Sequence, residues 1–280
     1  MPPDSLASTR PLSTRPRGLP TPRAVGRING RGLWTLYVKE VRRFLNVATQ
    51  TIMAPVVTTL LFLAVFTLAL GRSRTGVEGY DYGAFLAPGL MVMAMMQNAF
   101  ANTSSSLVIS KVQGNIVDVL MPPLSPFELT LGFAGGGLTR GLLVGAAVMA
   151  ATGLFVGYHV HDPLAILFFS ANASLLLSLL GILGGIWSEK FDHIAAVTNF
   201  VVTPLSFLSG TFYSLERLPE DWQVMAHFNP FFYMIDGVRY GYLGVADTPI
   251  WVGAAVLTTA NVALFLLCWL LFRRGYRLKA

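Results

Sequence analysis

The chain has few charged residues for its length. Asp, Glu, Lys and Arg make up 12% of its 280 residues, whereas hydrophobic residues make up 54%. A soluble domain carries about 25% charged residues, so a water-exposed surface on this chain would be mostly apolar. The composition therefore excludes an ordinary soluble protein and predicts one that folds in lipid.

The residue types that build catalytic and metal sites are also scarce. The single cysteine, Cys268, lies in an apolar run and is expected to behave as a small buried hydrophobic residue. His159 and His161 have no third ligand near them, and the motifs H-E-x-x-H and G-x-S-x-G are missing. We therefore predict no catalytic residue and no metal site.

A phosphate-binding loop is missing as well. No Gly-Lys pair occurs anywhere in the chain, which excludes the pattern G-x-x-x-x-G-K-[ST]. We therefore expect no cofactor in this chain. If its function uses ATP with Mg, another chain must hydrolyse it.

Positive charge gathers at the two ends of the chain. Residues 1–43 hold nine of the 20 Lys and Arg residues, and the last eight residues hold four. Residues 1–28 also hold six of the 16 prolines, so we expect a disordered basic tail there and one membrane domain over 29–280. Basic segments beside apolar ones favour membrane lipid as the partner, not nucleic acid.

Six segments are long and apolar enough to cross a bilayer as helices. They are about 51–71, 84–107, 127–156, 164–187, 194–211 and 250–272. With both tails placed inside, the inner tails and loops hold 15 Lys and Arg residues, whereas the outer loops hold four. This asymmetry predicts an all-α polytopic protein with its N- and C-termini in the cytoplasm.

The segment before the first span is amphipathic. Leu33, Tyr37, Val41 and Phe44 share one helical face of residues 31–47. This pattern predicts a helix that lies in the cytoplasmic interface of the membrane. The alternative is an ordinary basic flank of the first span.

A second amphipathic segment lies in loop 108–126. Val112, Ile116 and Val119 share one face, and the helix must stop at Pro122–Pro123 because proline cannot continue it. The opposite face carries Lys111, Asn115 and Asp118. Spacing alone leaves two interpretations open, a docking surface for a soluble partner or a solvated connector.

The third span combines closely spaced glycines with a charge. Gly137, Gly141 and Gly145 recur every four residues, a spacing that lets helix backbones approach closely in lipid. The pattern indicates either a sliding interface between subunits or gate helices, or static packing. Arg140 lies among them, where a charge costs about 2.5–3.5 kcal/mol at the membrane centre, so it must face a partner, a cavity or the cytoplasmic boundary.

Two further segments are polar for their position. In the second span, Asn98, Asn102 and Ser105 share a face, which favours hydrogen bonds between helices over the lining of a pathway. Residues 212–249 are aromatic but too polar to span, and they predict short helices that enter the outer leaflet part of the way.

Several short motifs occur together and in order from about residue 30 to the C-terminus. They are Lys39-Glu40, Ala87-Pro88-Gly89-Leu90, residues 115–126 (NIVDVLMPPLSP), Gly135-Gly136-Gly137 with Arg140-Gly141, Pro204-Leu205 with residues 209–213 (SGTFY), Asn229-Pro230 and residues 236–240 (DGVRY). With this set the chain resembles the membrane subunits of type-2 ABC exporters. That family includes polysaccharide, lipo-oligosaccharide and drug exporters, and the resemblance extends to lipo-oligosaccharide exporters of nodulation type.

The resemblance implies a homodimer of six-span subunits in a bacterial inner membrane, bound to two separate ATPase subunits. It implies that residues 110–121 form a coupling helix that docks into the ATPase, with the candidate residues Lys111, Gln113, Asn115, Ile116, Asp118 and Leu120. Residues 31–47 would be the connecting helix at the same interface, with Lys39, Glu40, Arg42 and Arg43. Residues 212–246 would form outer re-entrant helices.

On this basis we expect a non-catalytic permease that moves an amphipathic or lipid-linked cargo out of the cytoplasm or the inner leaflet. A self-contained secondary transporter is the main alternative, but it needs paired acidic residues in the membrane and internal repeats. A membrane-embedded enzyme is the third hypothesis, and it needs clustered His, Asp or Glu residues that face one side of the membrane. The spans contain almost no acidic residue and no such cluster.

Overall fold

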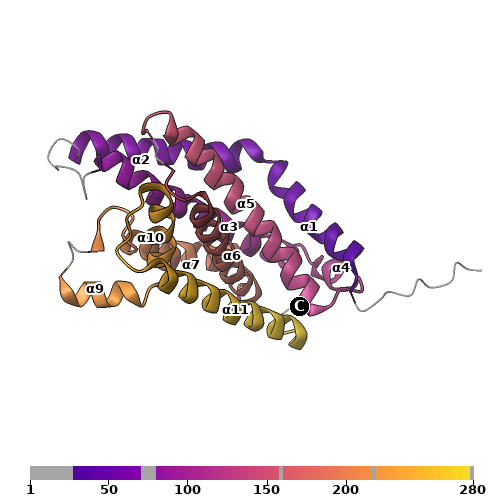
Figure 1. Ribbon diagram of the computed structural model, residues 1–280. Helices are drawn as coiled ribbons and strands as arrows, with labels where there is room; N and C mark the ends of the chain where they lie inside the picture. Colours follow the sequence, from indigo (N-terminus) through magenta and orange to yellow (C-terminus); the bar gives the residue numbers. More distant parts are fainter. Residues whose placement is uncertain (1–27, 71–79, 158–159, 216–218, 278–280) are drawn as a thin grey trace, which may run out of the picture.

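The structure is a computed structural model that describes residues 28–70, 80–157, 160–215 and 219–277. Every regular element in these ranges is a helix (Figure 1). In chain order they are α1 (Gly30–Leu45), η1 (Thr49–Met53), α2 (Ala54–Leu70), α3 (Tyr82–Val112), α4 (Ile116–Leu120), α5 (Pro126–Gly153), α6 (Pro163–Trp187), α7 (Phe191–Val197), η2 (Thr198–Val202), α8 (Thr203–Leu208), α9 (Glu220–His227), α10 (Pro230–Leu243) and α11 (Ile250–Arg274). The basic tail predicted for residues 1–28 lies outside the described residues, except for residue 28.

Six helical stretches have the length and apolar composition of membrane spans, which confirms the predicted number and the all-α class. They are Thr49–Ala69, Tyr82–Val112, Pro126–Gly153, Pro163–Trp187, Phe191–Leu208 and Ile250–Arg274. The fifth is composite, since the π-helix η2 joins α7 to α8.

The second span is longer than the sequence pattern predicted. It was expected to end near residue 107, but α3 continues to Val112. The polar run inside it does not break the helix because hydroxyl groups bond to carbonyls one turn back, from Ser104 Oγ to the Phe100 oxygen (2.7 Å) and from Ser110 Oγ to the Ser106 oxygen (3.0 Å).

The helix α3 forms the most enclosed of the six spans, whereas the first, fifth and last spans lie on the outside. The span in α3 has a mean hydropathy of 1.4 and is 83% buried, whereas the first and last spans have values of 2.3 and 2.2 and are 17% and 22% buried. Lipid solvates an apolar helix surface as well as protein does, so mean hydropathy alone does not decide which helix is enclosed: the fifth span has a mean hydropathy of 1.3 and is 11% buried. The helix α3 lies between α5 and α6 and also contacts α10.

The helix α1 packs along α5 at one end of the bundle (Figure 1). Its fully buried residues are Leu36, Glu40 and Phe44, and the predicted apolar residues Leu33 and Tyr37 flank this line half-buried. The buried stripe is therefore rotated slightly from the predicted face, because it includes a carboxylate that the hydrophobic pattern left out.

Residues 219–243 form two helices of different character. The short helix α9 lies at the edge of the molecule, at the end opposite α4 (Figure 1). In α10, almost every side chain from Phe231 to Leu243 is buried against α6, α11 and α3. The aromatic composition of this segment is therefore largely that of a protein core.

The start of α1, the helix α4 and the end of α11 gather at one end of the bundle (Figure 1). The opposite end holds α9 and the end of α2 (Figure 1). Because the chain crosses the bundle six times, both ends of the described chain lie on the same side.

Candidate functional site

The loop between α3 and α5 projects at the end of the bundle that holds the start of α1 and the end of α11 (Figure 1). Its short helix α4 is anchored by Ile116 and Val119, which are 3% and 7% exposed. Gln113, Asn115 and Asp118 are exposed on the outer side. The outward surface of the loop is mixed, because Val112, Val117 and Met121 are exposed beside these polar side chains.

A carboxylate fixes the loop to its neighbours. Ser125 and Glu128 form a capping box at the start of α5: the Ser125 N–H donates to Glu128 Oε2 at 2.7 Å, and the Glu128 N–H donates to Ser125 Oγ at 3.3 Å. The Asn29 N–H donates to the other oxygen of Glu128, and Asn29 Nδ2 donates to the Pro123 carbonyl at 3.2 Å. The start of α1 and the α4 loop therefore form one unit.

Not every residue proposed for docking reaches outward. Lys111 is half-buried, and its Nζ donates to the carbonyls of Ile186 and Ser188 at the end of α6, at 3.2 Å for Ser188. Ile116 points into the core, and Leu120 is partly buried. The outward-facing part of the predicted set is Gln113, Asn115 and Asp118.

The four residues proposed on α1 also divide into two kinds. Lys39 and Arg42 are exposed, whereas Glu40 is fully buried and Arg43 is half-buried. Glu40 Oε1 accepts a hydrogen bond from Ser106 Oγ at 2.7 Å, and its Oε2 pairs with Arg43 at 3.1 Å. Glu40 and Arg43 therefore connect α1 to α3, while Lys39 and Arg42 remain available to a partner.

One polar face of α3 binds two arginines from neighbouring helices. Arg43 from α1 donates to Asn102 Oδ1 at 3.0 Å and to Ser105 Oγ at 3.2 Å. Arg140 from α5 donates to Asn98 Oδ1 at 2.9 Å. The predicted interhelical bonding of Asn98, Asn102 and Ser105 is therefore observed, and Arg140 has an uncharged partner.

A polar cavity of about 710 Å³ adjoins this face. Its walls come from η1, α2 and α3, with Arg140 reaching in from α5. The polar part of the lining includes Gln50, Thr51, Thr58, Gln97, Asn98 and Arg140. A charge placed in a spanning helix thus faces a cavity, one of the three surroundings that the sequence allowed.

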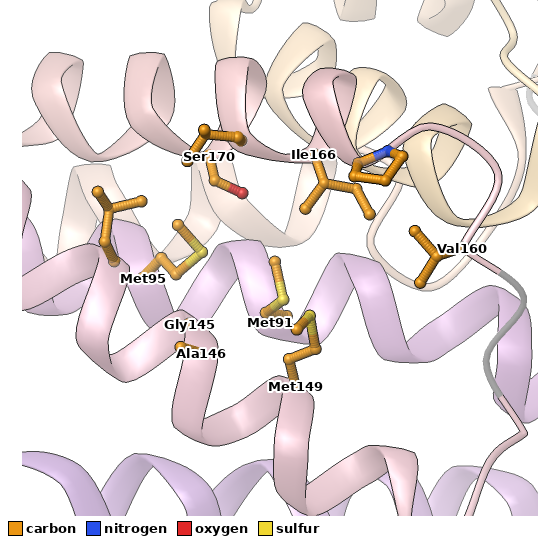
Figure 2. A pocket seen from close by; sticks show the side chains of 11 residues that line it. Met91, Met95, Gly145, Ala146, Met149, Val160, Ile166 and Ser170 are labelled. Carbon is orange, nitrogen blue, oxygen red and sulfur yellow. The ribbon is translucent and has the colours of Figure 1, made fainter.

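A second cavity is almost wholly apolar (Figure 2). It measures about 380 Å³ and lies between α3, α5 and α6. Figure 2 shows Met91, Met95 and Met149 turned toward one another across it, with Ser170 at its margin. Methionine side chains are flexible and polarisable, so such a lining adapts to aliphatic groups of different shapes.

The glycines of α5 pack within the chain. A Cβ at Gly141 would lie 2.5 Å from Ser174 Oγ, and one at Gly137 would overlap Ser178 and Thr103. Gly145 lies against Met95. These glycines allow α5 to approach α3 and α6 within the chain, and the sliding interface stays a prediction.

Other residues of the recognised motifs hold the opposite end of the bundle together. Asn229 caps α10 and donates to Ser209 Oγ at 2.9 Å. Arg239 is buried, donates to the Gly210 carbonyl at 2.7 Å and stacks over Phe85 at 3.9 Å. These contacts join α8, α10 and the start of α3.

Asp236 fixes the connection from α10 to α11. It accepts hydrogen bonds from the Asp247 N–H (2.8 Å), the Thr248 N–H (3.1 Å) and the Thr248 hydroxyl (2.6 Å). Burial raises the pKa of the Asp236 carboxyl, although these hydrogen bonds oppose the shift. The motif residues at this end are therefore architectural.

Sequence reasoning missed the burial of Glu40 and the junction at Glu128. The second was visible as the S-x-x-E pattern at residues 125–128, which signals a capping box. The first had no local signal, since Lys39-Glu40 reads as a solvated pair. Among the residues that the structure describes, no group of three or more His, Cys, Asp or Glu side chains is arranged to hold a metal ion.

Comparison with known proteins agrees with this architecture. The sequence pattern of the ABC-2 type transporter family matches residues 31–243. The inner membrane transport permease YadH of Escherichia coli K12 is 39% identical over 248 residues, which cover 89% of this chain and 97% of that protein.

More distant relatives cover much of the chain as well. Nodulation protein J of Rhizobium leguminosarum bv. viciae is 24% identical over 251 residues, 89% of this chain and 95% of that protein. The protein of the same name from bv. trifolii is 28% identical over 225 residues, 78% of this chain and 84% of that one. The chain is thus a membrane permease with six candidate spans, and it belongs to the ABC-2 type transporter family.

Proposed function

We propose that this chain is the permease subunit of an ATP-driven exporter. A separate ATPase subunit hydrolyses ATP with Mg, and two permeases assemble with two ATPases. The observation that carries the proposal is the α4 loop, which two buried residues anchor and whose polar side chains face outward. Family membership supports it, because a permease of this family requires an ATPase partner.

The surface around α4 suits a docking role. Exposed Lys39 and Arg42 on α1 lie at the same end of the bundle as Gln113, Asn115 and Asp118 (Figure 1). Because Glu128 ties the α4 loop to the start of α1, a push on α4 is transmitted to α1 and α5 as one body. ATP-driven closure of two ATPase subunits would supply that push.

The proposed cargo is amphipathic or lipid-linked. One cavity is polar and contains an arginine, and the other is apolar and lined by methionines. A molecule with a polar head and an aliphatic tail matches both kinds of lining. The direction of transport, from the cytoplasm or inner leaflet outward, is the one that the resemblance to type-2 ABC exporters implies.

We place the protein in the bacterial inner membrane with both termini in the cytoplasm. The Lys and Arg asymmetry of 15 to 4 supports this orientation. In it, α1 rests in the inner interface, and α9 with α10 forms the outer re-entrant pair. The gathering of the start of α1, the helix α4 and the end of α11 on one side agrees with this placement (Figure 1).

Gentle detergent co-purification of the tagged protein from its own cells tests the proposal. We expect a stoichiometric second chain with a phosphate-binding loop and ATPase activity, identified by mass. A homo-oligomer without an ATPase, even after mild crosslinking, would contradict the proposal and favour a self-contained secondary transporter.

A further inference from the structure

We propose that the polar cavity beside Arg140 binds the oxyanion headgroup of an amphiphile, such as a phosphate group. The cavity volume of about 710 Å³ lies within the usual range for small-molecule sites. This inference deepens the proposed function where the amphiphile is cargo, and it rests on that function only for the cargo assignment.

The charge balance at the cavity favours an anion. Arg43 and Arg140 converge on one face of α3, and Glu40 is the carboxylate that pairs with Arg43. Among the described residues, Arg140 has no carboxylate within ion-pair distance, and its recorded partner is the neutral Asn98 amide. The neighbourhood therefore carries one excess positive charge within a spanning segment, where an uncompensated charge is costly.

The hydrogen-bonding groups at the site lead to the same conclusion. In the described part of the chain, Arg140 Nε is a buried donor without an acceptor, and Arg140 belongs to the cavity lining; Arg43 Nε and Asn102 Nδ2 are two further such donors at the same face of α3, outside the lining. No Asp or Glu lines the cavity, whereas Gln and Thr side chains do. A site with spare donors and a guanidinium group matches an oxyanion, which accepts several hydrogen bonds and binds arginine strongly.

The rest of the lining explains why the ligand is an amphiphile rather than a free anion. Beside the polar groups, the cavity wall contains Pro55 and Phe62 from α2 and Leu90 and Met93 from α3. The α2 span is 17% buried, so this wall continues into a face that lipid covers. A headgroup bound at Arg140 would leave its aliphatic chains along that wall.

Asn98→Asp gives the sharpest test because it changes the charge and keeps the shape. The new carboxylate would lie where Asn98 Oδ1 accepts from Arg140 at 2.9 Å and would neutralise the excess charge. Arg140→Gln removes the charge itself. Arg274→Gln is the matched control, since it removes an exposed arginine at the end of α11.

In the first arm, the full-length protein is released from gentle detergent and weighed by native mass spectrometry without added lipid. We expect an anionic amphiphile on the wild type and on Arg274→Gln, and its loss from Asn98→Asp and Arg140→Gln. A mass that matches a host phospholipid identifies membrane lipid as the source, and another anionic amphiphile identifies cargo. Retention of the adduct by Asn98→Asp would overturn the proposal.

In the second arm, delipidated protein is titrated with dioctanoyl phosphatidylglycerol and dioctanoyl phosphatidylcholine, and the rise in Tm is measured. The tails are equal and the net charges differ, so we expect the wild type to prefer the anionic lipid about tenfold or more, as for one charge-assisted hydrogen bond. Asn98→Asp should lose this preference. Equal affinities of the wild type for the two lipids would overturn the proposal, whatever the first arm shows.

Neither arm contains an ATPase. A negative result from a protein that co-purifies with an ATPase would therefore remove the anion site and leave the exporter proposal intact. A positive result from a protein that has no ATPase partner would support the anion site and contradict the exporter proposal.

Discussion

Glu40 shows how one buried residue changes the role of a surface helix. On sequence it belongs to a polar pair on an amphipathic helix, but in the structure its side chain is fully buried and bonded to Ser106 and Arg43. Burying a carboxylate is costly unless hydrogen bonds and a counter-charge compensate for it. Glu40 therefore specifies how α1 is seated on α3.

Replacing Glu40 tests that role. Glu40→Gln removes the charge that pairs with Arg43 and should lower the free energy of unfolding by about 1–3 kcal/mol, as for a hydrogen bond to a charged group. Lys39→Gln, at the exposed neighbour, should stay within about 0.5 kcal/mol of the wild type. The measurement is thermal unfolding in detergent, and equal Tm values for the two variants would contradict the seating role.

At the scale of elements, small residues determine how α5 fits between α3 and α6. Gly141 faces Ser174 and Ala99, so the closest approach of α5 and α6 depends on having no Cβ at this position. Lipid offers little hydrophobic force between helices, and such close packing supplies much of the association.

A size exchange across this contact tests the packing. Gly141→Ala should lower stability by about 1–3 kcal/mol through overpacking against Ser174. Adding Ser174→Gly should restore most of the lost stability, because removing the Ser174 side chain leaves room for the new methyl group. Gly184→Ala is the control because its Cβ would meet Phe100 at an ordinary 3.4 Å. Failure of the double variant to recover Tm would show that this contact does not limit the packing.

The helix α4 is the element whose role depends on a partner. Its two anchors, Ile116 and Val119, belong to the core, whereas its polar residues face outward and make no contact that the bundle needs. The surface is therefore open to substitution without loss of the bundle, which makes a clean test of docking possible.

Asn115→Lys combined with Asp118→Lys places two positive charges on that surface. We expect association with the ATPase to weaken at least about tenfold, because mismatched interface charges cost several kcal/mol, and stimulation of ATP hydrolysis to fall toward the basal rate. Asp192→Lys, an exposed change in the first turn of α7, serves as control. Unchanged stimulation in the double variant would remove α4 from the docking surface.

At the scale of the whole molecule, three chain segments far apart in sequence gather at one end of the bundle. The start of α1, the helix α4 and the end of α11 lie together, and α9 lies at the opposite end (Figure 1). Because the bundle has these two distinct ends, its orientation across the membrane is a measurable property.

The single cysteine makes that measurement direct. Cys268 is buried, and Cys268→Ser gives a cysteine-free background whose hydroxyl replaces the thiol that bonds to the Leu179 carbonyl. In this background we expect Gln113→Cys to react with an impermeant maleimide only in inverted vesicles. Exposed Met225→Cys on α9 should react in intact cells. The reverse pattern would invert the proposed topology.

The sequence by itself determined the properties that depend on local composition. Segment length and hydropathy predicted six spans, which the structure contains, and the lack of a Gly-Lys pair excluded an ATP site of the phosphate-loop type. The orientation that the Lys and Arg asymmetry indicates stays a prediction. Proline placement also located the end of α4. Each of these follows from residues close together in the chain.

Tertiary structure decided which groups meet. Asn98 and Arg140 are 42 residues apart and Glu40 and Ser106 are 66 apart, and nothing in the local pattern pairs them. It also decided that Gly137, Gly141 and Gly145 of α5 face α3 and α6, and that most of the aromatic residues of α10 are buried. In lipid most spans are apolar on all sides, so hydropathy alone does not specify which helices are neighbours. The shapes of the helix surfaces and a few polar contacts specify them, and these contacts form only when the helices pack.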